Sequence, residues 1–276
     1  MNKATTEFEI MVSSGRITNV NAILENGICK LTIETVAQNE PVAAVVTQEK
    51  NAMENPQDAF VFVEASKLSL KDEFMKYKPK TKKEENLMKE LTELIKKGVK
   101  DFWAPKYDPS FNKERTGICY VPGEYPAINR SYEWWEKAAK EFCPERQSHL
   151  GSKSERVAFL GWYIKKVVES RPYPYGSVES AWHITCVDSK VLGHYNDLNY
   201  ARRGLEKTGS REAFGFFDLA NTYKILAYDE EARGFWVAGG GFDTSAKNCP
   251  LADLRVKSYK YEDLSYCVGW VVMPAA

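Results

Sequence analysis

The residue types that could carry catalysis are few in this chain, and their spacing is poor for chemistry. The three histidines are His149, His183 and His194. A metal site could combine His183 with Cys186 and with either Asp188 or His194. No pair of these residues has the close spacing of a zinc motif. Because lone histidines on helices are usually structural, we predict neither a metal site nor a cofactor.

The cysteines also give no sign of a metal site or of catalysis. They form no C-x-x-C pair and are scattered along the chain at Cys29, Cys119, Cys143, Cys186, Cys249 and Cys267. Scattered thiols are typical of small core residues, not of a zinc site or a disulfide framework. A cysteine–histidine nucleophile built on Cys186 or Cys249 has no local sequence signature. We therefore predict that the protein is not an enzyme.

A glycine-rich stretch near the C-terminus organises the remaining candidates. Gly239–Gly241 directly follow the apolar run Phe235–Ala238. Glycine weakens a strand unless the backbone must bend or approach closely, so the run predicts a tightly packed turn of a β core, with a surface turn as the alternative. A phosphate-binding loop would need a following Lys-Ser or Lys-Thr pair, which is missing. Trp236 and Trp270 could stack a sugar, but strand aromatics are more often core. Asp218 could be a catalytic carboxylate, but we expect it to cap a turn or bind backbone amides.

Composition narrows the class of protein. The chain has 276 residues, of which 43% are hydrophobic and 28% charged, with a formal net charge of zero. Such a balance argues against a general nucleic-acid binder, which carries a basic excess. No apolar run approaches the roughly 18 residues of a membrane span. The N-terminal residues lack the apolar region of a signal peptide, so we expect a cytoplasmic protein as synthesised, with display on a phage particle as an alternative.

The first part of the chain predicts two elements that precede a larger domain. Residues 1–70 are rich in β-type runs, and Asn26-Gly27 between two of them predicts a hairpin. Further strands are expected at Phe8–Val12, Val42–Val46 and Ala59–Val63. We interpret residues 1–70 as a small β-rich module and residues 71–100 as a helical connector, with a helix over Glu84–Lys97 ending at Gly98.

Three helices are predicted in residues 101–276. Ser131 is a candidate N-cap for the first, which Pro144 ends. Ser152–Glu155 has the spacing of a capping box and predicts the start of the second. Val178–Val187 predicts the third. Short strands and polar loops follow, so the fold class that we predict is α+β.

The order of motifs in residues 101–276 resembles the C-type-lectin-like fold of the formylglycine-generating enzyme (sulfatase-modifying factor) family. The matching stretches are Ala213–Asn221, Gly239–Phe242 and Gly269–Val271. That family typically reads Asn-x-Phe-Gly-Leu-Tyr-Asp-Met-x-Gly-Asn-Val-x-Glu-Trp, then Arg-Gly-Gly-Ser-Trp, then Gly-Phe-Arg. The resemblance implies a C-type-lectin-like domain over residues 101–276.

The departures from the family argue against its oxidase chemistry. Those enzymes bind copper through two cysteines, whose places correspond here to Thr244 and Cys249, and a lone thiolate is a poor soft-metal site. The family's calcium-ligating Asn-x-x-Glu retains Asn221, but Lys224 stands where the glutamate would be. An ammonium group cannot ligate a cation.

The same fold, with the same terminal motifs, carries the variable proteins of diversity-generating retroelements, and the chain is most similar to these. Their C-terminal codons are rewritten at adenines, and the altered side chains form a ligand-binding surface. Residues 240–268 contain many residue types reachable in this way, between framework-like residues such as Leu251, Leu254 and Val256. The ligand-binding residues that the resemblance implies are Phe242, Asp243, Thr244, Ser245, Ala246, Asn248, Tyr259, Tyr261, Asp263, Ser265 and Tyr266.

The function predicted is therefore non-enzymatic binding of a protein or glycan ligand by a diversified C-terminal surface. Tyrosine suits such a surface because it gives broad amphipathic contact at small entropic cost. An ordinary polar loop system is the alternative for these residues. The alternatives for the whole protein are a relative of the formylglycine-generating oxidases and a structural phage or surface protein.

Overall fold

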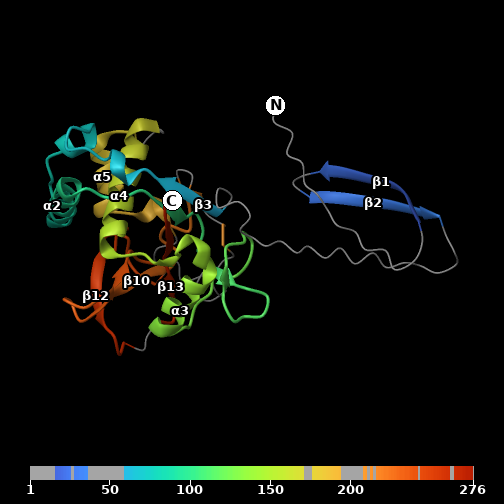
Figure 1. Ribbon diagram of the computed structural model, residues 1–276. Coiled ribbons are helices and arrows are strands. Elements are labelled where there is room, and N and C mark those ends of the chain that lie inside the picture. The colour runs from blue at the N-terminus through green and yellow to red at the C-terminus, as the bar shows by residue number, and fades with distance from the viewer. Residues whose placement is uncertain are drawn as a thin grey trace. The chain divides into compact units, whose positions relative to one another are not determined.

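The chain divides between Asn51 and Ala52 into two units in the computed structural model (Figure 1). The structure describes residues 16–25, 28–36, 59–170, 176–193, 208–209, 212–213, 216–241, 243–261 and 264–275, the first two ranges by their backbone alone.

A β-hairpin forms the described part of the first unit. Strand β1 (Arg16–Glu25) pairs antiparallel with β2 (Ile28–Val36), and Glu25 faces Ile28 across the turn. The hairpin predicted from Asn26-Gly27 is confirmed, because only these two residues separate the strands. The strands predicted at Phe8–Val12 and Val42–Val46 lie outside the described residues.

Two four-stranded sheets form the framework of the second unit. One has the strand order β3-β4-β14-β7 and the other β12-β11-β10-β13. The described strands of this unit are β3 (Phe60–Val63), β4 (Phe102–Pro105), β5 (Ser110–Phe111), β6 (Ile118–Cys119), β7 (His149–Leu150), β8 (Glu212–Ala213), β9 (Phe216–Phe217), β10 (Tyr223–Asp229), β11 (Gly234–Ala238), β12 (Leu254–Ser258), β13 (Cys267–Gly269) and β14 (Val271–Pro274).

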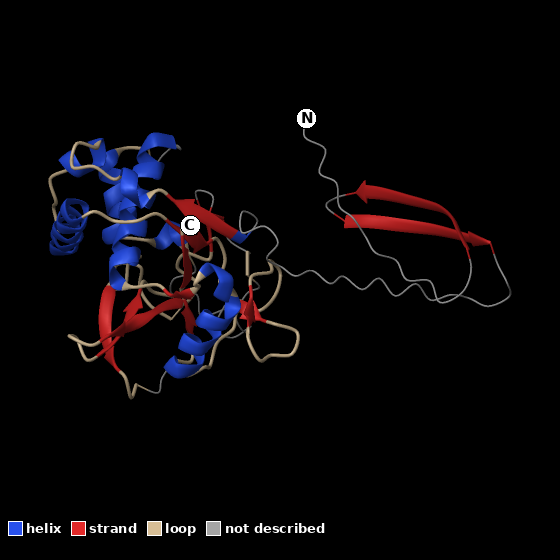
Figure 2. Ribbon diagram, in the orientation of Figure 1, coloured by secondary structure: helices blue, strands red, loops and turns tan. Residues whose placement is uncertain are grey.

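Four α-helices occur in the described residues, so the fold is of the predicted α+β class. They are α2 (Lys82–Lys97), α3 (Tyr132–Phe142), α4 (Lys153–Ser170) and α5 (Val178–Cys186), with short 3-10 helices at Ala65–Lys67, Glu73–Lys76, Pro144–Arg146 and Lys190–Leu192. Helices α2, α4 and α5 lie together at one end of the second unit and α3 lies at the other (Figure 1), with strands against both groups (Figure 2).

Local capping explains where these helices begin. The Ser131 hydroxyl accepts a hydrogen bond from the Trp134 amide at 3.3 Å, which confirms the predicted N-cap of α3. Ser152 and Glu155 form the predicted capping box of α4, each side chain accepting from the other's backbone amide. A second capping box, Thr81 with Glu84, starts α2 two residues before the predicted helix.

The expected boundary at residue 70 is corrected by the packing of β3 and α2. Strand β3 pairs with β4 in the second unit, although we assigned Ala59–Val63 to the N-terminal module. Leu87 and Leu91 of α2 are buried in the same core cluster as α4, so residues 71–100 are part of the second unit and do not merely connect two others. The sequence predicted the apolar stripe of α2, but it did not predict that this stripe packs against α4.

Trp270 links the two sheets and the helical core. It lies between β13 and β14, and its amide donates to the carbonyl of Ile225 in β10 at 3.0 Å. Its ring lies edge-on to Phe102 and Phe159, with centroid distances of 6.2 and 5.7 Å. The prediction that Trp270 is a core residue is therefore confirmed.

Candidate ligand-binding surface

The turn after β11 is part of the core and fixes the start of the predicted binding segment. Gly239 has a φ of 70°, a value that side-chain-bearing residues rarely adopt. A Cβ on Gly240 would lie 2.5 Å from the carbonyl oxygen of Cys249, and one on Gly241 would lie 2.8 Å from that of Asn221. The backbone thus approaches its neighbours too closely for side chains, which confirms the predicted tightly packed turn.

The residues directly after this turn divide into an exposed one and several that hold the turn. Asp243 is exposed. The Thr244 hydroxyl donates to the carbonyl of Gly241 at 2.9 Å and accepts from its amide at 3.1 Å. Ser245 accepts from the amides of Asn248 and Cys249, both at 3.0 Å, through its carbonyl. The half-buried Thr244 and Ser245 thus stabilise the segment.

The prediction that Ala246 is a ligand-binding residue is corrected by its burial. Its side chain is buried and belongs to the core cluster around α4, so it cannot contact a ligand. Asn248 is exposed but lines neither of the two hollows described next. Phe242 and Asp263 lie outside the described residues.

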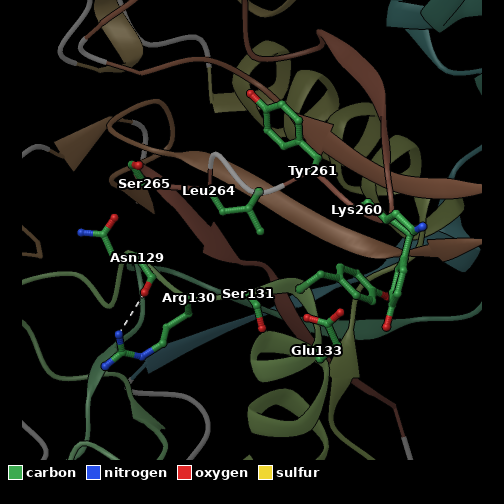
Figure 3. A pocket seen from close by; sticks show the side chains of 10 residues that line it. Asn129, Arg130, Ser131, Glu133, Lys260, Tyr261, Leu264 and Ser265 are labelled. Atoms are coloured by element: carbon green, nitrogen blue, oxygen red, sulfur yellow. Dashed lines mark hydrogen bonds between the residues drawn. The ribbon is translucent and has the colours of Figure 1, made fainter.

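Three of the predicted residues line a hollow of about 470 Å³ beside the N-terminus of α3. Tyr259, Tyr261 and Ser265 come from the segment after β12, and residues 129–133 form the opposite wall. In Figure 3, Arg130 and Glu133 lie on the α3 side of the hollow, and Tyr261 and Ser265 lie across from them.

A second hollow, of about 120 Å³, joins the two halves of the predicted surface. Asp243, Tyr261 and Tyr266 line it together with Tyr223, Arg255 and Lys257. Tyr261 lines both hollows, so they adjoin. Of the nine predicted residues that the structure describes, five therefore line one continuous surface: Asp243, Tyr259, Tyr261, Ser265 and Tyr266.

Aromatic packing holds this surface against α3. The ring of Tyr132 stacks on Phe235 of β11, with a centroid distance of 5.0 Å, and its hydroxyl accepts from the Tyr228 amide at 2.6 Å. Tyr259 lies edge-on to both Tyr132 and Tyr228, at 5.7 and 5.6 Å. Tyr259 is 42% exposed, so one edge of its ring is anchored while another faces solvent.

Glu133 connects the α3 wall to the tyrosines. It forms hydrogen bonds with its own backbone amide and with the side chains of Ser131 and Tyr259, and these bonds lower the pKa of its carboxyl. The hydrogen bond that the Tyr259 hydroxyl donates to Glu133 is the largest cause of the raised pKa of this hydroxyl. Tyr259 therefore donates a hydrogen bond to an ionised carboxylate at neutral pH.

Sequence reasoning missed the basic residues and the α3 wall of this surface. Arg255 and Lys257 share one face of β12 and line the second hollow, whereas Val256, interpreted as framework, is 41% exposed. The period-2 alternation of a strand could have placed Arg255 and Lys257 on one face. Nothing in the local sequence signals that Arg130, more than a hundred residues earlier, lines the same hollow as Tyr261.

Asp218 and Lys224 belong to a buried polar cluster. The Asp218 carboxylate accepts hydrogen bonds from the amides of Gly209 and Asp108, at 2.8 and 3.3 Å, which confirms the predicted role of binding backbone amides. The Lys224 ammonium pairs with the Asp108 carboxylate and also donates to the Asp218 carbonyl at 3.0 Å and the Thr222 hydroxyl at 3.2 Å. This ammonium group is therefore itself the cation of the cluster.

The other candidates for chemistry are dispersed. Burial raises the pKa of the Cys249 thiol and, more strongly, that of Cys186. His183 is exposed on α5, and His194 lies outside the described residues. No group of three or more metal-ligating side chains occurs within the described ranges. Among the helices that the structure describes, none is long and apolar enough to cross a membrane.

Comparison with models of known protein families finds no match for this sequence. A search of curated proteins likewise finds none that is significantly similar.

Proposed function

We propose that the protein is a non-enzymatic ligand-binding protein and that its binding surface is the wall of the two adjoining hollows. The observation that carries this proposal is the convergence of Asp243, Tyr259, Tyr261, Ser265 and Tyr266, which come from two stretches of sequence, on one surface. Tyrosine dominates the set, as it does in surfaces that recognise ligands through rigid amphipathic contact.

We further propose that the second unit has a C-type-lectin-like fold and that the surface is diversified, as in the variable proteins of diversity-generating retroelements. This proposal is supported by the separation of structural residues from exposed residues around the turn at Gly239–Gly241. The glycines and Thr244 carry the packing and the turn hydrogen bonds, while Tyr259 and Tyr266 are exposed. Substitutions at exposed positions usually change stability by less than about 0.5 kcal/mol, so such positions tolerate variation.

The diversification proposal is tested on DNA. We expect a near-identical template repeat and a reverse transcriptase gene beside this gene, with differences between repeat and gene confined to adenines of the template. Codons for Tyr259, Tyr261 and Tyr266 should be among the differing positions. A genome without the repeat and the reverse transcriptase would refute the diversification proposal.

The binding proposal is tested on the protein. Ligands are selected for the full chain from a displayed random-peptide library and remeasured with Tyr261→Ser. We expect affinity to fall at least about tenfold, since a central tyrosine is a typical hot spot. The matched control is Tyr125→Ser, which removes a 61% exposed tyrosine that lines neither hollow. Equal losses in both variants, or no loss in either, would contradict the proposal.

A further inference from the structure

We propose that the ligand of this surface is an acidic polypeptide segment whose carboxylates are bound by Arg130, Lys257 and Lys260. The inference rests on the proposed binding function and specifies the ligand's chemistry. It follows from the charges that line the hollows and from the contacts that those charges already make.

Arg130 is held in place without a carboxylate partner among the described residues. Its guanidinium lies 4.6 Å from the ring centroid of Phe111 and 5.4 Å from that of Trp134. One of its nitrogens donates to the Asn129 carbonyl at 2.9 Å, a contact drawn in Figure 3. Aromatic stacking orients the group, and its remaining N–H donors form a planar fork that fits a carboxylate.

Two lysines extend this positive charge across the hollows. The Lys257 ammonium lies 4.4 Å from the ring centroid of Tyr261, the residue that both hollows share. Lys260 is exposed on the wall of the larger hollow. In the part of the chain that the structure describes, neither ammonium forms an ion pair. Both charges are thus available to an anionic ligand.

On the walls of the two hollows the described cations outnumber the described carboxylates, with Arg130, Arg255, Lys257 and Lys260 against Glu133 and Asp243. Glu133 is engaged by Ser131, Tyr259 and the start of α3. The Glu133 carboxylate therefore already accepts from a backbone amide at the N-terminus of α3. The positive charge that a ligand would meet on these walls comes from side chains. Asp243 is the other described carboxylate that lines the hollows, and it lies by the smaller one. Glu262 and Asp263 follow in sequence and lie outside the described residues.

The shape of the surface favours a peptide over a small anion. The two hollows adjoin, and the cations are distributed over both instead of converging on one point. Exposed tyrosine edges at Tyr259 and Tyr266 offer apolar contact between the charged positions. An extended segment that alternates acidic and apolar side chains satisfies both features. An anionic glycan also carries negative charge, but it has less apolar surface to contact the tyrosines.

The test uses the full chain and a fluorescent peptide in which glutamate alternates with alanine. Anisotropy gives the dissociation constant at low salt, and the same peptide with glutamine in place of glutamate is the matched probe. We expect the glutamine peptide to bind at least about tenfold more weakly, and the glutamate peptide to weaken as salt rises from about 50 to about 300 mM. A glutamine peptide that binds equally well would overturn the inference.

Protein variants locate the site. Arg130→Gln/Lys260→Gln should weaken binding of the glutamate peptide about tenfold, and Lys257→Gln by a few-fold, as expected for exposed ion pairs. The control Lys89→Gln/Lys96→Gln removes the same charge from exposed positions on α2 and should leave binding unchanged. Thermal unfolding checks that each variant is folded. If the double variant Arg130→Gln/Lys260→Gln does not fold, Lys257→Gln alone provides the test. Equal weakening in the control would mean that the effect is one of net charge, against the inference.

The outcomes separate this inference from the function on which it rests. If neutral library peptides lose affinity in Tyr261→Ser while the glutamate peptide never binds, the binding function holds and the acidic ligand is wrong. If a sulfated oligosaccharide binds through Arg130 and Lys260 and the glutamate peptide does not, the ligand is an anionic glycan and the inference is also wrong. If Tyr261→Ser affects no ligand, both proposals fail.

Discussion

Replacing Lys224 with methionine should lower the free energy of unfolding by about 3–5 kcal/mol, because a buried carboxylate then loses its cation. The side chains of Lys224 and Asp108 are only 7% and 4% exposed. Methionine fills much of the lysine's volume, so the loss reflects charge and hydrogen bonding more than a cavity. After the change, the described contacts leave Asp108 with the Thr222 hydroxyl as its hydrogen-bond donor, at 2.7 Å.

The magnitude is large against the whole stability of a protein, which is typically about 5–15 kcal/mol. For a unit of this size each kcal/mol shifts the melting temperature by about 2–4 °C, so we expect a fall of roughly 10 °C. All seven tryptophans lie in the second unit, so fluorescence during denaturant unfolding reports on that unit. Lys89→Met on exposed α2 is the control and should change stability by less than about 0.5 kcal/mol.

The double variant Asp108→Asn/Lys224→Met separates the ion pair from the packing. With both charges removed, at least half of the lost stability should return, because the Asp108 carboxylate that paired directly with Lys224 is no longer buried as a charge. A single Lys224→Met variant that costs less than about 1 kcal/mol would refute this account of the cluster. So would a double variant whose cost equals the sum of its two single changes.

The dependence on pH gives a second check of the same cluster. Burial and the neighbouring Asp108 raise the pKa of Asp218 to about 7, from an ordinary value of 3.8. Between these values the folded state binds more protons than the unfolded state, so this contribution to stability falls as pH rises. Lys224 lowers the Asp218 pKa. Removing Lys224 therefore raises that pKa further, and the pH range over which this stability is lost extends to higher pH. The cost of Lys224→Met should therefore be greater at about pH 8 than at about pH 5.

Three further changes test the turn, the start of α4 and the tyrosine surface. Gly240→Ala should cost about 1–3 kcal/mol in denaturant unfolding, because its Cβ meets a backbone carbonyl oxygen at 2.5 Å; a change below that range would show that the turn relaxes. The hydrogen bond with Glu155 raises the pKa of His149, so the stability it adds is fully present below about pH 6.5 and is lost as pH rises through the folded value. His149→Gln should accordingly shift the thermal midpoint more at about pH 5.5 than at about pH 8.5, and an equal shift at both would contradict this. Glu133→Gln should lower the pKa of Tyr259, followed by ultraviolet or NMR titration, and an unchanged titration would mean that the two side chains do not interact in solution.

Sequence patterns located the elements of this fold better than their partners. The helix starts at Ser131 and Ser152 were predictable because an N-cap acts within one turn of backbone. The hairpin at Asn26-Gly27 was predictable because two residues alone set its connection. The boundary at residue 70 was wrong because strand pairing between β3 and β4 joins segments about forty residues apart, and no local signal encodes that choice.

The binding surface shows the same limit more sharply. By itself the sequence determined that a constrained glycine turn precedes a tyrosine-rich segment, because residue type restricts backbone conformation directly. Only the tertiary structure decided that Ala246 turns into the core, that Arg130 lines the same hollow as Tyr261, and that Lys224 pairs with Asp108 across 116 residues. Burial and charge pairing depend on which distant segments pack together, and that is a property of the whole fold, not of any stretch within it.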